Sequence, residues 1–440
     1  MEQPGPLEPR AISIVGGGLA GLAAAWELVE AGRGKDLTLF EQGDRLGGRV
    51  HAVDLDGVVM ELGGFMVFSW YRELRALLQA TGLEDELVIY RTTKQYFEQP
   101  DGGYQGYGRT PLRQLVPLRA RARMLPMYLT GKLNIYHPDL SLYRDDTADT
   151  FYRRLAGDNL YAPWLLDALF AGYTYAETAQ LQTPIYLPLA PMIVLRGGFD
   201  RVWTLPGGMG RLIDAVTKRL VDAGVQICTK TQVLGCDNTT ITVTRDGQTV
   251  TMDAGTVILA SGITDPILYQ VLPEAVRPQR DCTHHWSIVW ESSDAIRIDG
   301  DANWGTIYNA PRGSDAAPHI ACYGHASAIQ DHGDRHLVIG YLRIHPNDVN
   351  TYDAVTVARL ASAQLSRELD VPADTTVVAT YEWKPTMPMT TIDLLETIRR
   401  HDGRNGRWFA GDHMGAPSME VAVFTGRAAA KRVLETSEPK

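Results

Sequence analysis

The sequence contains little that would indicate a disulfide-linked or metal-bound protein. No CxxC spacing occurs among its four cysteines, Cys228, Cys236, Cys282 and Cys322. This argues against a disulfide framework and against a structural zinc site. The histidines and aspartates between His319 and His336 cross an expected loop, and we expect no metal there. Because such sparse cysteine is typical of a reducing compartment, we expect a cytoplasmic protein.

The chain also lacks long apolar runs and an excess of basic residues. No stretch reaches the roughly 18 apolar residues of a membrane span, and the first nine residues, MEQPGPLEP, lack a secretory signal pattern. With 42 Lys+Arg against 52 Asp+Glu the net charge is -10, so no overall field attracts nucleic acid or anionic lipid. We therefore expect no integral membrane segment and no nucleic-acid partner.

What remains is the composition of an ordinary globular protein. The 440 residues are 45% hydrophobic and 21% charged, which excludes a largely disordered chain. A chain of this length exceeds a comfortable single core, so two domains are expected.

The first fifty residues predict a strand, a glycine turn and a helix. The apolar segment 11–15 (AISIV) leads into GGGLAG at 16–21, a GxGxxG match formed by Gly16, Gly18 and Gly21. Such glycines allow a tight turn that brings a pyrophosphate to the helix N-terminus. A second strand at 36–41 ends in Glu41, 20 residues after Gly21. A dinucleotide-binding fold places a carboxylate there to accept the ribose hydroxyls.

Two further glycine segments follow, RLGGR at 45–49 and ELGG at 61–64. Together with GGGLAG and Glu41, they resemble the FAD-binding head of the flavin amine oxidase superfamily, which also contains phytoene desaturases and protoporphyrinogen oxidases. The resemblance implies FAD rather than NAD. It also implies that Arg49 lies near the pyrophosphate and that Gly63 and Gly64 lie against the isoalloxazine ring.

Motifs far downstream extend the resemblance. WFAGD at 408–412 and PSMEVAV at 417–423 are similar to the family's closing flavin motif, which implies that Gly411 and Asp412 approach the ribityl chain or the pyrophosphate. Ser418 is a suitable N-cap for a C-terminal helix, whose amides around Met419 would face the N1–C2=O edge of the flavin. The segment around Val233 resembles the family's strand whose backbone meets the adenine.

The expected fold is therefore α/β, with a Rossmann-like FAD-binding domain of the GR2 type and a second α+β substrate domain made from two insertions. We expect the FAD-binding domain to comprise residues 1–65, 197–282 and 391–440. The substrate-binding domain then comprises residues 66–196 and 283–390. The boundary between two domains is a common place for a cleft, so we expect the substrate there, facing the flavin.

The catalytic residues are less clearly marked. Classical members of the superfamily carry a strand lysine near flavin N5, but no lysine occurs between Lys230 and Lys384. His284 and His285 lie at about that place, and a neutral imidazole can hold a water or remove a proton. Paired strand histidines are also commonly one core group and one surface group. Lys384 is a third catalytic candidate, or alternatively a solvated lysine beside a turn.

A flat apolar pocket is predicted from aromatic residues, although such residues are often only core: Tyr175, Trp286, Tyr341 and Trp383. Amine oxidases place an aromatic residue just before the closing ME, where this chain has Ser418. The downstream motifs look closer to the desaturase branch.

We interpret the chain as an FAD-dependent oxidoreductase. It would transfer a hydride from a C–H bond of an apolar biosynthetic intermediate to flavin N5, in a C–C or C–N desaturation, with molecular oxygen reoxidising the flavin. An alternative is an amine oxidase acting on an amine or amino acid derivative. An alternative of another class is a non-enzymatic relative similar to the Rab escort proteins and GDP-dissociation inhibitors. The sequence leaves the oligomeric state open, a homodimer included.

Overall fold

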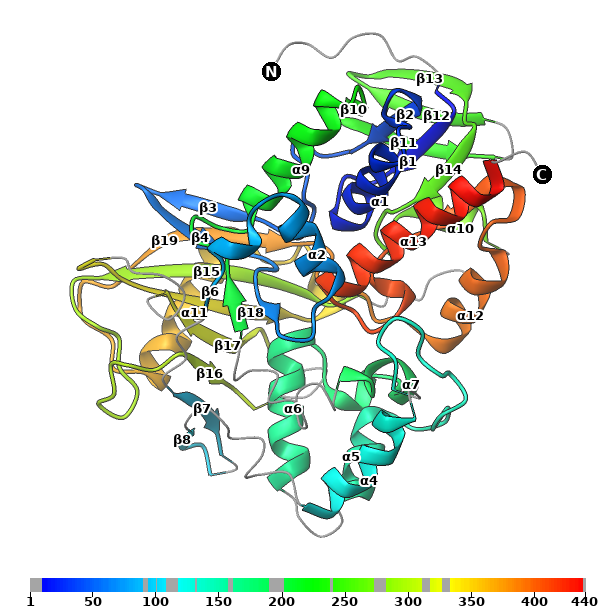
Figure 1. The fold of residues 1–440 in the computed structure, drawn as a ribbon. Coiled ribbons are helices and arrows are strands. Elements are labelled where there is room, and N and C mark those ends of the chain that lie inside the picture. The colour runs from blue at the N-terminus through cyan, green and yellow to red at the C-terminus, as the bar shows by residue number, and fades with distance from the viewer. Residues whose placement is uncertain are drawn as a thin grey trace.

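The computed structural model describes residues 10–437 apart from ten short gaps, at 90–93, 100, 108–117, 131–132, 157–160, 190–201, 238–239, 273–281, 311–316 and 327–332. Figure 1 shows that the first and last segments of the chain lie together in one half of the molecule, and that a large sheet and a group of helices form the other half.

A five-stranded parallel sheet forms the centre of the first half. Its strand order is β10-β2-β1-β14-β20, and every neighbouring pair is parallel. Strands buried on both faces need continuous apolar runs, and β1 and β2 are buried at all four positions. In sheet order, the strands span Gln226–Cys228, Leu37–Phe40, Ile12–Val15, Thr256–Leu259 and Arg407–Phe409.

Helices and a small sheet cover this parallel sheet. Helix α1 packs against both α9 and α13, so elements from the two ends of the sequence form one layer. This helical layer consists of α1 (Leu19–Glu30), α9 (Gly210–Asp222) and α13 (Met419–Ser437). The remaining elements of this half are β11 (Thr231–Cys236), β12 (Thr240–Arg245), β13 (Gln248–Asp253), α10 (Pro266–Gln270) and α12 (Ile392–His401).

A seven-stranded sheet, ordered β19-β15-β18-β17-β16-β7-β8, forms the centre of the second half. Its neighbouring strands are antiparallel except for the parallel pair β16 and β7. Helix α11 (Ala354–Glu368) packs on one face, and α6 (Tyr161–Thr174) packs on part of the other. The strands span, in sheet order, Thr376–Trp383, His284–Ser292, His336–Ile344, His319–His325, Thr306–Tyr308, Gln95–Glu98 and Tyr104–Tyr107.

Shorter elements connect the two halves and complete the helical part of the second. The structure confirms the α/β class, with a Rossmann-like parallel sheet and a second, mainly antiparallel sheet. The connecting strands are β3 (Ala52–Leu55), β4 (Val58–Glu61), β5 (Val67–Phe68), β6 (Val88–Ile89) and β9 (Val202–Thr204). The other helices are α2 (Glu73–Ala80), α4 (Leu118–Leu129), α5 (Ala148–Ala156) and α7 (Thr183–Tyr186).

Candidate active site

The glycine turn between β1 and α1 has the geometry of a phosphate-binding turn. Gly16 has a φ of +103°, and a Cβ on Gly21 would lie 1.9 Å from the Gly16 carbonyl oxygen. Neither position therefore accepts a side chain. Gly18 is the N-cap of α1, and a Cβ there would meet no atom of the described residues within 4 Å. The helix N-terminus thus faces open space, as binding of a pyrophosphate requires.

Glu41 follows β2 at the carboxyl edge of the parallel sheet, where α/β folds bind ligands. Its Oε2 accepts a hydrogen bond from the Gly17 amide at 2.8 Å, and its Oε1 accepts one from the Gly43 amide at 2.7 Å. The Thr231 amide, at the start of β11, donates to the Glu41 carbonyl. The same strand carries Val233, which is buried. The carboxylate and the predicted adenine strand are thus neighbours.

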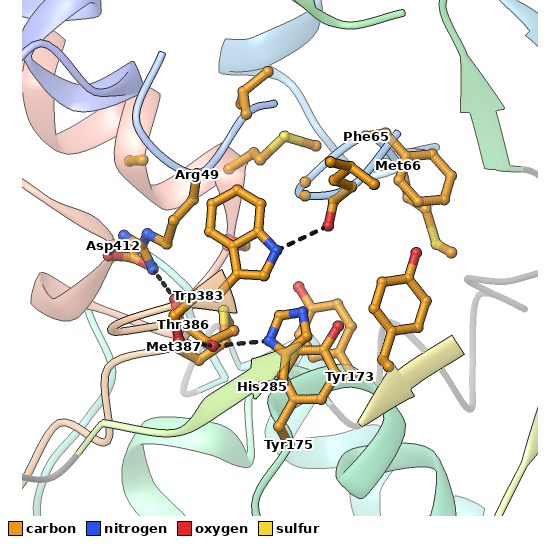
Figure 2. A pocket seen from close by; sticks show the side chains of 18 of the residues that line it. Arg49, Phe65, Met66, Tyr173, Tyr175, His285, Trp383, Thr386, Met387 and Asp412 are labelled. Atoms are coloured by element: carbon orange, nitrogen blue, oxygen red, sulfur yellow. Dashed lines mark hydrogen bonds and ion pairs between the residues drawn. The ribbon is translucent and has the colours of Figure 1, made fainter. Parts of the chain in front are cut away.

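Arg49 and Asp412 join segments that are distant in sequence. The Arg49 guanidinium donates two hydrogen bonds to the Asp412 carboxylate, at 2.7 and 2.8 Å, and a third to the Thr386 carbonyl at 3.0 Å (Figure 2). Although burial opposes it, the negative charge of Asp412 raises the pKa of Arg49, which therefore stays a cation. The pair fixes the RLGGR and AGD segments to each other.

The glycines of ELGG pack against this pair and against α13. A Cβ on Gly63 would lie 2.1 Å from the Arg49 carbonyl oxygen and 2.9 Å from the Trp383 ring, and one on Gly64 would lie 3.2 Å from the Met419 sulfur. Ser418 caps α13, because its Oγ accepts a hydrogen bond from the Val421 amide at 3.2 Å, as the sequence predicts. The predicted flavin segments thus form one continuous wall.

A cavity of about 1530 Å³, including its open mouth, lies along this wall. Seven predicted cofactor residues line it, namely Arg49, Gly63, Gly64, Gly411, Asp412, Ser418 and Met419. One face of the seven-stranded sheet forms the opposite side, through His285, Thr306, Tyr308, Cys322, Gly324, Ile339, Tyr341 and Trp383.

Three of the four predicted substrate residues line this cavity, namely Tyr175, Tyr341 and Trp383. The fourth, Trp286, lies on the opposite face of the sheet, in a separate core with Ile288 and residues of α11. Side chains alternate between the two faces of a strand, so a residue adjacent to His285 on β15 points away from the cavity.

Only one of the three catalytic candidates lines the cavity in the described part of the chain. His285 lines the cavity, whereas neither His284 nor Lys384 is among the described residues that line it. His284 is half-buried, and burial lowers its pKa. The Lys384 ammonium forms an ion pair with Glu382 at 2.6 Å and a hydrogen bond to Asn350 at 2.7 Å. The lysine is thus engaged at the outside of the sheet.

His285 makes a hydrogen bond through each ring nitrogen. Nδ1 lies 2.8 Å from Thr386 Oγ1, and Nε2 lies 3.2 Å from Ser287 Oγ. Ser287 donates its only hydroxyl proton to the Leu62 carbonyl at 2.9 Å, so Nε2 carries the imidazole proton and Nδ1 accepts one from Thr386. Burial, with the charge of His284 added, lowers the pKa of His285 to about 3. The ring is therefore neutral at physiological pH.

Trp383 and Tyr175 fix the surroundings of this imidazole. The Trp383 indole nitrogen donates to Ser287 Oγ at 3.1 Å and to the Leu62 carbonyl at 3.2 Å. The Tyr175 ring stacks on His285 with a centroid distance of 4.1 Å. Tyr175 has a φ of +57°, a left-handed conformation that costs roughly 1–2 kcal/mol for a residue with a Cβ. Figure 2 shows these rings grouped beside the Arg49–Asp412 pair.

The lining of the sheet side is uncharged. Burial raises the pKa of Tyr173 and that of the Cys322 thiol to about 12, and raises that of Tyr175 further. These groups therefore stay protonated. Among the described side chains that line the cavity, the only acid and the only permanent cation are Asp412 and Arg49, which are paired.

Sequence reasoning missed Glu420, which fixes α13 to α2. This buried carboxylate accepts hydrogen bonds from the amides of Arg72, Glu73 and Leu74 at 2.6–2.9 Å, and from the Tyr136 hydroxyl at 2.5 Å. It thus caps the N-terminus of α2 from another part of the chain. Sequence reasoning also missed Thr386 and Ser287, because a lone threonine or serine has no sequence signal that connects it with a distant histidine.

Residues 19–265 match the model of the family described as flavin-containing amine oxidoreductases. The match covers more than half of the chain. The chain belongs to this family. The open glycine turn, the carboxylate of Glu41 and the wall around Arg49 and Asp412 all suit a dinucleotide, and FAD is the cofactor of this flavin-containing amine oxidoreductase.

Individual relatives extend the comparison. Putrescine oxidase from Kocuria rosea is 39% identical over 98 residues, which is 22% of this chain and 20% of that protein. Coproporphyrinogen III oxidase from Bacillus subtilis is 25% identical over 287 residues, which is 57% of this chain and 59% of that protein. The matched region thus spans less than two thirds of either relative.

Solved structures agree on the fold. Cyclohexylamine oxidase from Brevibacterium oxydans superposes with a TM-score of 0.68 at 14% identity, covering 98% of this chain and all of that one. A fatty acid isomerase from P. acnes that produces CLA has a TM-score of 0.67 at 15% identity, covering 97% and 99%. At such identities the likeness concerns the fold. No helix in the described part of this flavin-containing amine oxidoreductase is long and apolar enough to cross a bilayer.

Proposed function

We propose that the protein oxidises an uncharged, largely apolar substrate by removing a hydride from a C–H bond and a proton from the neighbouring atom, forming a C=C or C=N bond. Molecular oxygen would be the terminal electron acceptor, with hydrogen peroxide as the co-product. The observation that carries this proposal is the neutral lining of the sheet side of the cavity, since the described cavity wall offers a cationic substrate no free carboxylate.

FAD, when bound, supplies the electron sink that accepts the hydride at N5. The glycine turn at the start of α1 and the carboxylate of Glu41 would bind its pyrophosphate and ribose. Arg49 and Asp412 fix two chain segments to each other, and these segments would hold the pyrophosphate and ribityl part of the cofactor. The capped N-terminus of α13 directs its positive end at the cavity wall, which favours negative charge there.

The sheet side orients the substrate and excludes water. Tyr173, Tyr175 and Tyr341 line the cavity, and such aromatic residues suit a flat apolar molecule with few polar groups. His285 carries its proton at Nε2 and donates a hydrogen bond from it to Ser287 Oγ. We therefore assign His285 the role of a neutral positioning residue. It fixes Trp383 through Ser287, and Tyr175 through the ring stack.

Anaerobic mixing of the yellow enzyme with candidate substrates tests this function. We expect uncharged apolar compounds with an activated C–H bond to bleach the flavin absorbance band, and small amines that are protonated at neutral pH, such as putrescine, to leave it unchanged. Rapid bleaching by amines, with stoichiometric peroxide on admission of air, would contradict the proposed substrate class and support amine oxidation. A protein that purifies colourless and cannot be reconstituted with FAD would support a non-enzymatic role.

A further inference from the structure

Gly324 lines the cavity beside Thr306, Tyr308, Cys322 and Ile339, and we call this part of the lining the cavity floor. The backbone does not require a glycine at this position. Gly324 lies inside β17 and is not among the glycines with a positive φ. It pairs in register with Thr306 on β16 and with Ile339 on β18, so no bulge explains it. Glycine inside a strand weakens the strand, and one without such a reason marks a place where a ligand approaches closely.

Packing restricts Gly324 through a single side chain, which would have to move by a few tenths of an ångström to admit a Cβ. Among the described residues, a Cβ built there would meet only Cγ2 of Ile339, at 3.3 Å. Two nearby glycines provide the contrast. A Cβ on Gly172 would lie 2.7 Å from the Tyr308 ring, and one on Gly340 would lie 2.7 Å from the Trp290 ring. Protein atoms fill the space above those two glycines, whereas the space above Gly324 belongs to the cavity.

The surroundings of this space define what it can hold. Thr306, Tyr308, Cys322 and Ile339 line it beside Gly324, and none of these side chains carries a charge. The sheet order β15-β18-β17 places Gly324 two strands from His285. Since neighbouring strands lie about 4.8 Å apart, the separation of these two strands is about 10 Å. The floor at Gly324 thus lies two strands away from His285 across the sheet.

We propose that Gly324 is a specificity-determining residue, and that the floor around it holds the non-reacting end of an extended, uncharged substrate. The proposal rests on the function proposed above and adds the length of the substrate to it. The open space above Gly324 sets the depth of the cavity, so a larger side chain there would shorten the longest ligand that the cavity accepts.

A series of uncharged probes of increasing length tests this role. Phenylalkanols from benzyl alcohol to 6-phenylhexan-1-ol are titrated into the holoenzyme, and binding is followed by the perturbation of the flavin spectrum. In the wild type we expect the dissociation constant to fall about four-fold with each added methylene. In Gly324→Val the shortest alcohol should bind within about two-fold of the wild type, and the longest should bind at least about ten-fold more weakly.

Gly235→Val is the matched control, because Gly235 also lies in a strand and a Cβ there would meet nothing closer than 3.6 Å. It should keep the wild-type length profile. If Gly324→Val does not fold, Gly324→Ala makes the same test with a smaller change. The proposal would be overturned if the dissociation constant of the Gly324 variant changed with alcohol length as it does in the wild type. It would also be overturned if the dissociation constant of the wild type did not depend on alcohol length. Failure of every substrate to reduce the wild-type flavin would instead overturn the proposed function.

Discussion

Two single variants, His285→Ala and His284→Ala, are compared. The comparison measures what the cavity-lining histidine contributes to stability and to the rate of flavin reduction. The His285 change removes the acceptor of the Thr386 hydroxyl and the stack on Tyr175, whereas Ser287 keeps its hydrogen bonds to Leu62 and Trp383. A buried polar group left unpaired costs roughly 1–3 kcal/mol, and an aromatic pair contributes roughly 0.5–1.5 kcal/mol. We therefore expect His285→Ala to lower the free energy of unfolding by about 1.5–4.5 kcal/mol.

His284→Ala should cost less than about 1 kcal/mol, because the ring is half-buried and no described residue makes a hydrogen bond to its Nδ1. Urea unfolding of both holoproteins measures the difference. Stopped-flow flavin reduction should be slowed by His285→Ala, with FAD retained, and His285→Gln should recover part of the rate. The rate should show no ionisation near pH 6.5, because His285 stays neutral. An equal loss of stability and rate in the two alanine variants would refute this assignment.

Further predictions concern the cofactor wall and the response to acid. Gly21→Ala would place a Cβ 1.9 Å from a backbone oxygen of the glycine turn, so its FAD content, measured by absorbance, should fall well below one per chain. Asp412→Asn removes the charge that pairs with Arg49 and should release FAD on dialysis that leaves the wild type yellow. Burial lowers the pKa of His285 to about 3 and that of His413 to about 4. Because the unfolded chain takes up these protons from pH 6.5 downward, each should cost about 2 kcal/mol of stability at pH 5, measured by urea unfolding at pH 7 and pH 5. A histidine titration followed by NMR that gives either ring a pKa near 6.5 would contradict the buried, neutral state of both rings.

The cofactor segments could be read from the sequence because their geometry is local or repeated. A turn that needs φ of +103° at Gly16 and no side chain at Gly21 restricts the residue type directly. The N-cap at Ser418 likewise depends on a residue only three positions away. The convergence of these segments was predicted from the family resemblance. The match to the flavin-containing amine oxidoreductase family confirms that resemblance.

The sheet side was harder to predict because it depends on which face of each strand is buried. His285 and Trp286 are adjacent aromatic residues on β15, and both faces of this strand are buried, so no alternation of polar and apolar residues distinguished them. The pairing of Lys384 with Glu382 and the contact of Thr386 with His285 depend on the path of the chain after β19. Gly324 gave no signal, since its importance lies in the space above it.

A crystal structure of the purified yellow protein, with the released cofactor identified by chromatography, tests the central claim most directly. The account predicts one FAD per chain, with its pyrophosphate at the glycine turn of α1, and its isoalloxazine ring between the Gly63–Gly64 wall and the sheet face that carries His285. A nicotinamide dinucleotide at the turn, or a flavin ring outside the cavity lined by Trp383 and Tyr175, would contradict it.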